Sequence, residues 1–346
     1  MLKRVIAVVM AVMLASVFIM ACGNGGNGDA ATGDFTPAAE IVAPEGKTLG
    51  VLPVDAVSEE PLRIATVMVQ NNPFGIAVMQ GQYFAKEVLA DRNVTVDVIS
   101  VDDFDAHLWT TVLEDLIAMD YDAITFFGIG EALQPVVDRG VEAGILMYSF
   151  NTEPGNDSLR QAWFGQSGFD GGAQVASKLV ELMDGEGQFG IITGDFAVLG
   201  HEERRLGARS VTDDVPGMEL VGEWMNNDRA EEAYSITNDM IAAFPDLRGI
   251  YVTAGGPSGA ARALANAGLA DQIVLVCHDV LDASAPYIAD GYIRAALDQD
   301  PFNQGYMPVV AAFNTLMGED PPPDQTFFEG VIAVPETVRD LFPELF

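Results

Sequence analysis

Hydrophobic residues recur in short runs that alternate with longer amphipathic stretches from residue 62 onward. The first run, residues 62–69, is apolar and partly β-branched, which is typical of a strand buried on both faces of a parallel sheet. Residues 76–91 follow with helical spacing, and the alternation of strand and helix continues as far as residue 150. It begins again near residue 163 and runs to about residue 334. Such an alternation predicts βαβ units and an α/β fold with parallel sheets.

The remaining elements are predicted from the same two periodicities. Strands are expected at residues 94–101, 123–127, 145–150, 189–193, 218–224, 249–253, 273–276, 293–297 and 327–334, with a short crossing segment at 163–166. Helices are expected at residues 106–119, 131–143, 169–183, 202–215, 231–244, 258–267, 283–289 and 304–316. Two successive sheets of this kind predict two similar Rossmann-like lobes, and 346 residues suffice to give each lobe its own core.

The division of the chain between the two lobes follows from the order of these elements. We expect one lobe to comprise residues 61–165 and 300–325, and the other to comprise 166–299 and 326–346. Three crossovers, near Gln166, Gln299 and Asp324, would then form a hinge between the lobes.

The amino terminus has the pattern of an export signal. Lys3 and Arg4 precede an unbroken apolar run, so residues 1–21 predict a secretory signal peptide, with an uncleaved membrane helix as the alternative. The end of this run, Ile19-Met20-Ala21-Cys22, resembles a bacterial lipobox, in which the cysteine is lipidated and becomes the mature amino terminus. Residues 22–60 are rich in Gly, Asn and Pro and predict a flexible tether. We therefore expect a lipid anchor on the extracytoplasmic face of the cell membrane.

The net charge narrows the choice of partners. The formal charge is −34, and Lys occurs only at positions 3, 47, 86 and 178. Such a surface repels phosphate backbones, so nucleic acid is not an expected partner. The second cysteine, Cys277, lies in an apolar run and is expected to be a small buried hydrophobe.

Polar and aromatic side chains follow the predicted strands at the points where the strands end. Ligands of open α/β sheets bind outside these carboxyl ends, so the residues there are candidates for a binding site. Amides and carboxylates suit the hydroxyls of a sugar, which both donate and accept hydrogen bonds. An aromatic face, from Phe74 and also from Trp163 or Trp224, would cover the sugar's apolar faces. The candidate ligand-binding residues are Asn72, Phe74, Asn151, Thr152, Glu202, Asn227, Asp279 and Gln299.

Three of these loops carry a family resemblance: Asn71-Asn72-Pro73-Phe74, Cys277-His278-Asp279, and Gln299 within the segment 298–306. On these motifs, residues 62 to about 334 resemble the periplasmic sugar-binding proteins of the ribose-binding type, whose fold is shared with the ligand domains of LacI-type regulators. The resemblance implies a monomeric, non-enzymatic binding protein without a cofactor. It would capture a sugar or polyol between its lobes by hinge closure and deliver it to the membrane permease of an ABC transporter.

The chain departs from this family at two places in the second lobe. Several members have an Arg before the helix predicted at 202–215, and the register here puts Glu202 or Glu203 at that position. A frequent Asn-Asp pair is replaced by the small residues 254–257. The predicted wall is therefore more acidic and smaller, and an aminated sugar, a polyol such as inositol, or a larger sugar would each fit it.

Other classes of function would use some of the same residues. A metal site could use His201, Glu202, His278 and Asp279, but their spacing matches no metal motif, and no metal is expected. The chain lacks a G-x-S-x-G elbow, a P-loop lysine and a G-x-G-x-x-G turn, which argues against an enzyme. The glycine-rich segment 255–259 could bind phosphate. A nucleoside-binding lipoprotein, or a sugar sensor feeding a chemoreceptor or sensor kinase, remain alternatives.

Overall fold

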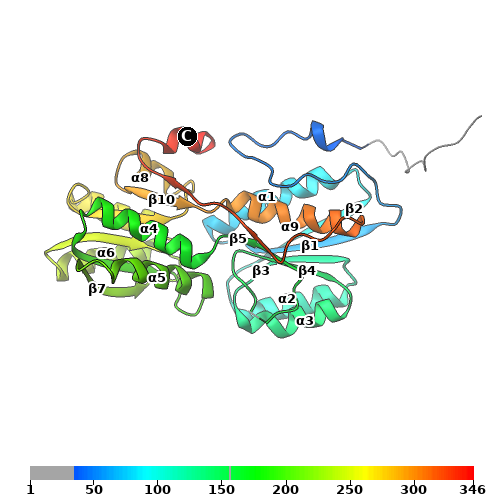
Figure 1. The fold of residues 1–346 in the computed structure, drawn as a ribbon, viewed down its shortest axis with the longest axis horizontal. Coiled ribbons are helices and arrows are strands. Elements are labelled where there is room, and N and C mark those ends of the chain that lie inside the picture. The colour runs from blue at the N-terminus through cyan, green and yellow to red at the C-terminus, as the bar shows by residue number, and fades with distance from the viewer. Residues whose placement is uncertain (1–34, 156) are drawn as a thin grey trace, which may run out of the picture.

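The computed structural model describes residues 35–155 and 157–346. The expected signal peptide, Cys22 and the first part of the expected tether lie outside the described residues. Within the described part, two six-stranded sheets lie beside each other, and helices pack on each (Figure 1). The prediction of an α/β fold with two lobes is confirmed.

The first lobe is built on a wholly parallel sheet. Its strand order is β11 (Gln325–Phe327), β5 (Ala162–Gly165), β4 (Leu146–Phe150), β3 (Ala123–Phe127), β1 (Leu62–Val69) and β2 (Val94–Val101). Helices α1 (Pro73–Leu89) and α9 (Pro301–Leu316) pack together on one face, and α2 (Ala106–Ala118) and α3 (Gln134–Glu142) lie on the other (Figure 1). Gly81 of α1 and Gly305 of α9 allow this close approach, because a Cβ at either position would lie 1.9 or 2.0 Å from a carbonyl oxygen of the other helix. The strands and helices share one hydrophobic core.

The second lobe repeats this architecture with one antiparallel edge strand. Its order is β12 (Val331–Ala333), β10 (Ala295–Asp298), β9 (Val274–His278), β8 (Leu247–Val252), β6 (Glu186–Thr193) and β7 (Gly217–Met225), with β12 antiparallel to β10. Helices α4 (Gly168–Leu182) and α5 (Leu199–Thr212) pack together, as do α6 (Ala230–Ala243) and α7 (Pro257–Ala267). The short helices α8 (Ala285–Ala289) and α10 (Val338–Leu341) complete the lobe. Successive residues of β8 alternate between the two cores: Ile250 and Val252 enter one, and Tyr251 enters the other.

The described chain passes between the sheets three times: from β5 to α4, from β10 to α9, and from β11 to β12. Gln166 and Gln299 lie in the first two crossings, as expected. The third crossing follows Phe327 instead of lying near Asp324, because the run predicted as one strand at 327–334 is divided between the two sheets. Gly330 lies in this crossing, where a Cβ would come within 2.1 Å of the Gln166 side chain.

Helix α1 begins three residues earlier than its hydrophobic pattern predicts. Asn72 is its N-cap, and its side-chain oxygen accepts hydrogen bonds from the backbone N–H groups of Phe74 (2.8 Å) and Gly75 (3.3 Å). Pro73 fills the first helical position, where a missing N–H costs nothing. The cap therefore fixes the geometry of the loop at the carboxyl end of β1.

The described part of the expected tether is bound to the first lobe. Residues 35–61, here called the N-terminal strap, run along α1 and α9 (Figure 1). Arg92 is fully buried and donates to the carbonyl oxygens of Thr36 (2.6 Å) and Val54 (3.4 Å). Asn303 and Asn314 exchange further bonds with the strap backbone. Because its polar backbone groups have these partners, the strap does not behave as free tether.

The strap also reaches the second lobe. Lys47 forms an ion pair of 2.5 Å with Glu344 in the carboxyl-terminal segment, whose neighbours Val338 and Phe342 are part of the second-lobe core.

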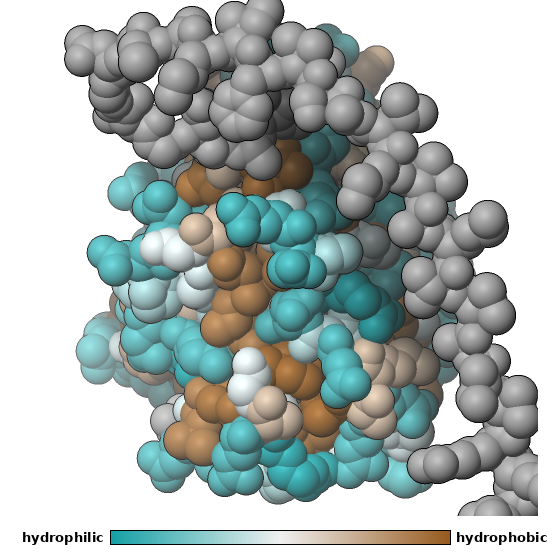
Figure 2. Space-filling model, turned by 90° about the vertical axis from the view of Figure 1, so that its right-hand side faces the viewer, coloured by the Kyte–Doolittle hydropathy of each residue, from teal (hydrophilic) through white to brown (hydrophobic). Residues whose placement is uncertain are grey.

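Among the described residues, no helix has the length and apolar character needed to cross a membrane. Figure 2, a view onto the end of the first lobe, shows hydrophobic residues lying between hydrophilic ones on this surface.

Candidate functional site

A cavity of about 430 Å³ lies between the two lobes. It is bordered by loops at the carboxyl ends of strands from both sheets, the position at which open α/β sheets bind ligands. The first lobe contributes amide and aromatic side chains: Asn71, Asn72, Phe74, Phe104, Phe127 and Asn151. The second lobe contributes small or uncharged residues from its loops together with all of the charged or titratable ones, His201, Arg204, Asp228, Arg229, Glu231 and Asp279, and Gln299 lies in the crossing between the lobes.

Gln299 is the centre of a hydrogen-bond network that joins the two lobes. Its side-chain oxygen accepts from Asn151 Nδ2 (3.0 Å) in the first lobe and from Arg204 Nη2 (2.9 Å) in the second. Its nitrogen donates to Asp279 Oδ1 at 2.7 Å. The charges of the partners fix the orientation of this amide, because a flip would set its oxygen against the carboxylate and its nitrogen against the guanidinium. Asn151 Nδ2 also donates to Gln304 at 2.8 Å, so the first-lobe side of the network is held by α9.

Asp279 and Arg204 form the charged part of this network. Burial raises the pKa of the Asp279 carboxyl, and the charge of Arg204 and the bond from Gln299 oppose that rise. Arg204 is only 7 % exposed and also donates to the Thr253 carbonyl oxygen at 3.1 Å. Two opposite charges are thus held at the cavity wall with their hydrogen-bonding directions fixed, which suits the recognition of ligand hydroxyls.

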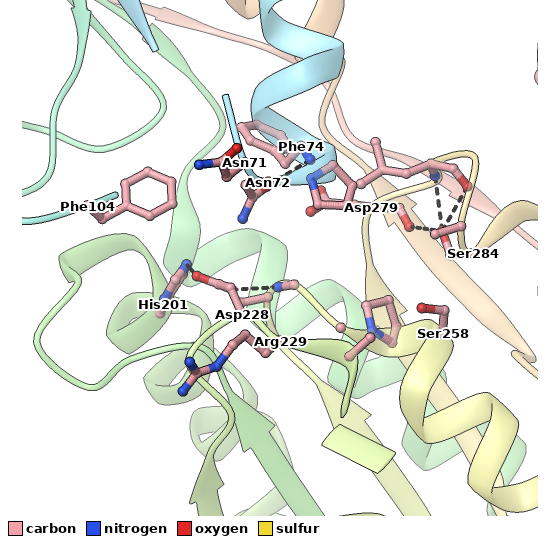
Figure 3. A pocket seen from close by; sticks show the side chains of 18 of the residues that line it. Asn71, Asn72, Phe74, Phe104, His201, Asp228, Arg229, Ser258, Asp279 and Ser284 are labelled. Carbon is pink, nitrogen blue, oxygen red and sulfur yellow. Dashed lines mark hydrogen bonds and ion pairs between the residues drawn. The ribbon is translucent and has the colours of Figure 1, made fainter. Parts of the chain in front are cut away.

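The aromatic side of the cavity belongs to the first lobe. Phe104 follows β2 and lies against Phe127 at the end of β3, with ring centroids 5.1 Å apart. Phe74, in the first turn of α1, is largely buried and also lines the cavity. In Figure 3, Phe104 and Phe74 lie on the opposite side of the cavity from Asp228. They can cover the apolar face of a ring-shaped ligand.

The expectation that Trp163 or Trp224 would cover a sugar is wrong. Trp163 is buried in β5 and packs on Phe327, and Trp224 in β7 packs on Phe244. Neither residue lines the cavity. Both side chains project from the faces of their sheets, whereas the cavity lies at the strand ends.

Several cavity residues adopt the left-handed backbone conformation, which is uncommon outside glycine. Asn151 has φ 64°, Asp228 has φ 56° and Asp279 has φ 71°. Asn and Asp tolerate this region better than other residues, because their short side chains bond locally. Each of these turns directs a polar side chain into the cavity in place of continuing its strand. Backbone conformations of this kind concentrate at functional sites.

The structure brings together five of the eight predicted site residues. Asn72, Phe74, Asn151, Asp279 and Gln299 all line the cavity.

The other three lie elsewhere. Thr152 is buried behind Asn151, to whose oxygen its hydroxyl donates at 3.3 Å, so it can position that amide. Asn227 donates to Glu232 at 2.6 Å and lines a neighbouring hollow. Glu202 pairs with Arg205 at 2.6 Å, away from the cavity.

Arg204 occupies the wall position for which the predicted register gave Glu202 or Glu203. Helix α5 begins at Leu199 and not at residue 202, and His201 and Arg204, three residues apart, lie on its cavity side. Helical spacing shows that these two residues share a face, but it does not show that this face is turned to the cavity. The predicted acidic wall is consequently of mixed charge, because Arg204 and Arg229 accompany its carboxylates.

Sequence reasoning also missed Phe104, Asp228 and Arg229. Phe104 follows β2 by the same rule that identified Asn72 and Asn151, and Asp228 follows β7. The rule that residues after a strand end border the binding site could therefore have identified both residues. The predicted small residues, Ala254 and Gly255, do border the cavity, as does Ser258 at the start of α7.

The described residues contain no group of three or more His, Cys, Asp and Glu side chains placed to hold a metal ion. His278 lies beneath the cavity, stacked on Tyr251 and hydrogen-bonded to its hydroxyl at 2.9 Å. Burial, with Arg204 and His201 nearby, lowers the pKa of His278 well below its usual range, so the ring is neutral. His201 therefore lines the cavity, whereas His278 is bonded to Tyr251 beneath it.

A family model described as the periplasmic binding protein domain matches residues 65–320. The chain belongs to this family. The cavity between two α/β lobes is the place where a member of a binding-protein family would hold its solute.

Curated relatives in this family share about a quarter of their residues with the chain. The D-ribose/D-allose-binding protein of Pseudomonas aeruginosa is 27% identical over 297 residues, which cover 82% of this chain and 91% of the relative. The D-allose-binding periplasmic protein of Escherichia coli is 25% identical, with 68% and 78% of the two chains covered. These relatives are named as binding proteins and not as enzymes.

Solved structures with the same fold include an ABC transporter solute-binding protein from Burkholderia graminis in complex with D-arabinose. It superposes with a TM-score of 0.76 at 20% identity, covering 81% of this chain and 97% of that one. A solute-binding protein from Agrobacterium vitis, bound with α-D-tagatopyranose, gives a TM-score of 0.73 at 22% identity and covers 81% and 96%. At these identities, the likeness shows the fold.

Proposed function

We propose that this protein is an extracytoplasmic substrate-binding lipoprotein that captures a sugar or polyol between its lobes and delivers it to an ABC transporter permease. The observation that carries the proposal is the Gln299 network, which joins Asn151 of one lobe to Arg204 and Asp279 of the other beside the cavity. The names of its curated relatives support the same ligand class.

The cavity walls have the chemistry that a sugar requires. Amides and charged groups can each meet hydroxyls, and phenylalanine rings can cover the C–H faces. A ligand that touches both walls binds the closed arrangement better than the open one, and it is this difference that drives closure. The crossings at Gln166, Gln299 and 328–330 are where the hinge would bend.

Membrane attachment through a lipid on Cys22 is part of the proposal and rests on the signal sequence. Metabolic labelling with a tagged fatty acid should mark the unaltered protein and should not mark Cys22→Ala. If the unaltered protein takes up no fatty acid and keeps its signal segment in the membrane, the segment is an uncleaved anchor and lipidation is refuted.

Thermal unfolding of the mature protein, from residue 22 onward, tests the ligand class. The panel comprises D-ribose, D-allose, D-arabinose, D-xylose, myo-inositol and nucleosides. A ligand at a hundredfold its Kd adds about 2.7 kcal/mol to the free energy of unfolding, which raises the melting temperature by several degrees.

The variants Asp279→Asn and Asn151→Ala should lose this shift, while Asp184→Asn, an exposed aspartate far from the cavity, should keep it. A shift of the melting temperature with nucleosides alone would overturn the sugar proposal in favour of a nucleoside-binding lipoprotein. No shift with any compound would overturn the proposal.

A further inference from the structure

His201 and Asp228 face each other in the second-lobe wall without forming a hydrogen bond. His201 Nε2 and Asp228 Oδ2 are 3.8 Å apart, which is too long for a direct bond. Their side chains are only 14% and 16% exposed. Figure 3 shows both of them beside the cavity, across from Asn71 and Phe104 of the first lobe.

The histidine presents a hydrogen-bond donor to this gap. The backbone N–H of Asp195 donates to His201 Nδ1 at 3.1 Å, so Nδ1 is an acceptor and carries no proton. Burial, helped by the charge of Arg204 and opposed by Asp228 and Asp195, lowers the pKa of His201 below its usual range. In the neutral ring the hydrogen therefore lies on Nε2, the atom that faces Asp228.

The aspartate presents an acceptor to the same gap. Asp228 Oδ1 accepts from the backbone N–H of Gly255 at 2.7 Å, which leaves Oδ2 for another partner. Two consecutive left-handed residues, Asn227 (φ 51°) and Asp228 (φ 56°), direct this side chain inward.

Glycines pack around the pair and leave no space for a larger residue. A Cβ at Gly194 would lie 2.5 Å from Asp228 Oδ1 and 2.6 Å from His201 Cε1. A Cβ at Gly255 would lie 2.9 Å from the same Oδ1. The donor and the acceptor are therefore held in place before any ligand arrives.

We infer that His201 and Asp228 together bind one hydroxyl of the ligand, with Nε2–H donating to the hydroxyl oxygen and Oδ2 accepting its proton. Two atoms 3.8 Å apart can both lie at hydrogen-bonding distance from one oxygen placed between them. The inference rests on the proposed function and narrows its ligand class.

The pair discriminates between the groups that a sugar derivative can carry. An ammonium group has no acceptor for the histidine N–H, and a carboxylate has no proton for Asp228. A hydroxyl satisfies both. Of the ligands that the sequence left open, this favours a neutral sugar or polyol over an aminated sugar.

Calorimetric titration with monodeoxy sugars tests the inference. The probes are whichever of D-ribose, D-allose, D-arabinose, D-xylose and myo-inositol binds the mature protein most tightly, and its monodeoxy analogues. The variants are His201→Phe and Asp228→Asn. Their controls are His107→Phe, at an exposed histidine of α2, and Asp184→Asn, at an exposed aspartate with nearly the same backbone φ (57°) as Asp228.

Hydrogen bonds to charged groups are worth more than neutral ones, so we expect Asp228→Asn to weaken binding of the full sugar by about 10- to 100-fold and His201→Phe, which removes a neutral donor, by about 3- to 10-fold. One deoxy analogue should bind the unaltered protein more weakly than the full sugar, and each variant, which keeps only one of the two partners, should discriminate less between that analogue and the full sugar. Both controls should match the unaltered protein, and melting temperatures without ligand show whether each variant is folded.

The outcomes separate the two proposals. If a sugar binds and both variants penalise every deoxy analogue as the unaltered protein does, His201 and Asp228 bind no hydroxyl and the inference is wrong. Tighter binding of the matching amino sugar than of the sugar itself would also overturn it. If no sugar or polyol binds any form of the protein, the proposed function itself fails.

Discussion

The two walls of the interlobe cavity differ in chemistry although the lobes share one architecture. The first-lobe wall consists of amides and phenylalanines and carries no charge. The second-lobe wall combines two arginines with three carboxylates and a histidine. The stacking of a sugar on an aromatic ring depends weakly on the orientation of the sugar's hydroxyls, whereas hydrogen bonds from charged groups depend strongly on that orientation.

The difference assigns separate tasks to the lobes. We expect the first wall to supply general affinity for a partly apolar molecule and the second wall to select among hydroxyl arrangements. Gln299 connects them, because its single amide bonds to both. The predictions below test this division of tasks.

Removing the buried arginine should have the largest effect. In Arg204→Met, the Gln299 oxygen and the Thr253 carbonyl lose their donor, and Asp279 is left buried without an opposite charge. Loss of one partner in such a network costs several kcal/mol, so sugar affinity should fall on the order of a thousandfold by calorimetry. Arg205→Met, at the neighbouring residue that pairs with Glu202 and Glu223, is the control. Equal losses in the two variants would contradict the assigned role.

A carboxyl at the end of β10, next to the crossing between the walls, should make stability depend on pH. Burial, together with Asp300 and Asp279, raises the pKa of Asp298 to about 7, while the Asp300 backbone bond and Lys47 oppose the rise. The folded state therefore binds this proton more tightly than the unfolded state. The stabilisation is fully present below about pH 4 and is lost as the pH rises through 7.

Comparison with Asp298→Asn isolates this group. The difference in free energy of unfolding between the unaltered protein and the variant should shift by up to about 4 kcal/mol in favour of the variant between pH 4 and 8. Denaturant titrations at several pH values measure it. A difference that does not vary with pH would show that Asp298 has an ordinary pKa.

Truncating an aromatic ring in the first wall should have a smaller and less selective effect. Phe104→Ala removes a stacking surface but no directional bond, so affinity should fall about tenfold for every sugar that binds. Phe169→Ala, at an exposed phenylalanine of α4, is the matched control. A changed order of preference among the sugars would show that the first wall also selects.

The smallest effect is expected where the strap meets the second lobe. The Lys47–Glu344 pair is partly exposed, so Lys47→Ala should lower the free energy of unfolding by no more than about 1 kcal/mol, and less at high salt. Lys178→Ala, which breaks an ion pair within α4, gives the comparison for an intralobe pair. A larger loss would indicate that the strap holds the lobes together.

The sequence predicted the fold and the first-lobe amides because both follow from local rules. Strand ends are visible in the hydrophobic pattern, and this placed Asn72, Asn151 and Asp279 correctly at the cavity. Arg204 was missed because helical spacing does not show which of the consecutive residues 201–205 face the cavity, and that depends on how α5 packs. The tryptophans were misplaced because periodicity shows that a strand residue is buried but not what covers it.

Under the proposed lipidation of Cys22, the strap would also determine which lobe is held near the membrane. With Cys22 lipidated, as proposed, only the twelve residues 23–34 separate the anchor from Phe35, where the described chain begins on the first lobe. Covalent geometry limits the span from Cys22 to Phe35 to about 45 Å at full extension. The strap itself is bound along α1 and α9, so it does not lengthen the connection between the anchor and the first lobe. The first lobe would then stay close to the membrane, and opening and closing would move the second lobe relative to the permease.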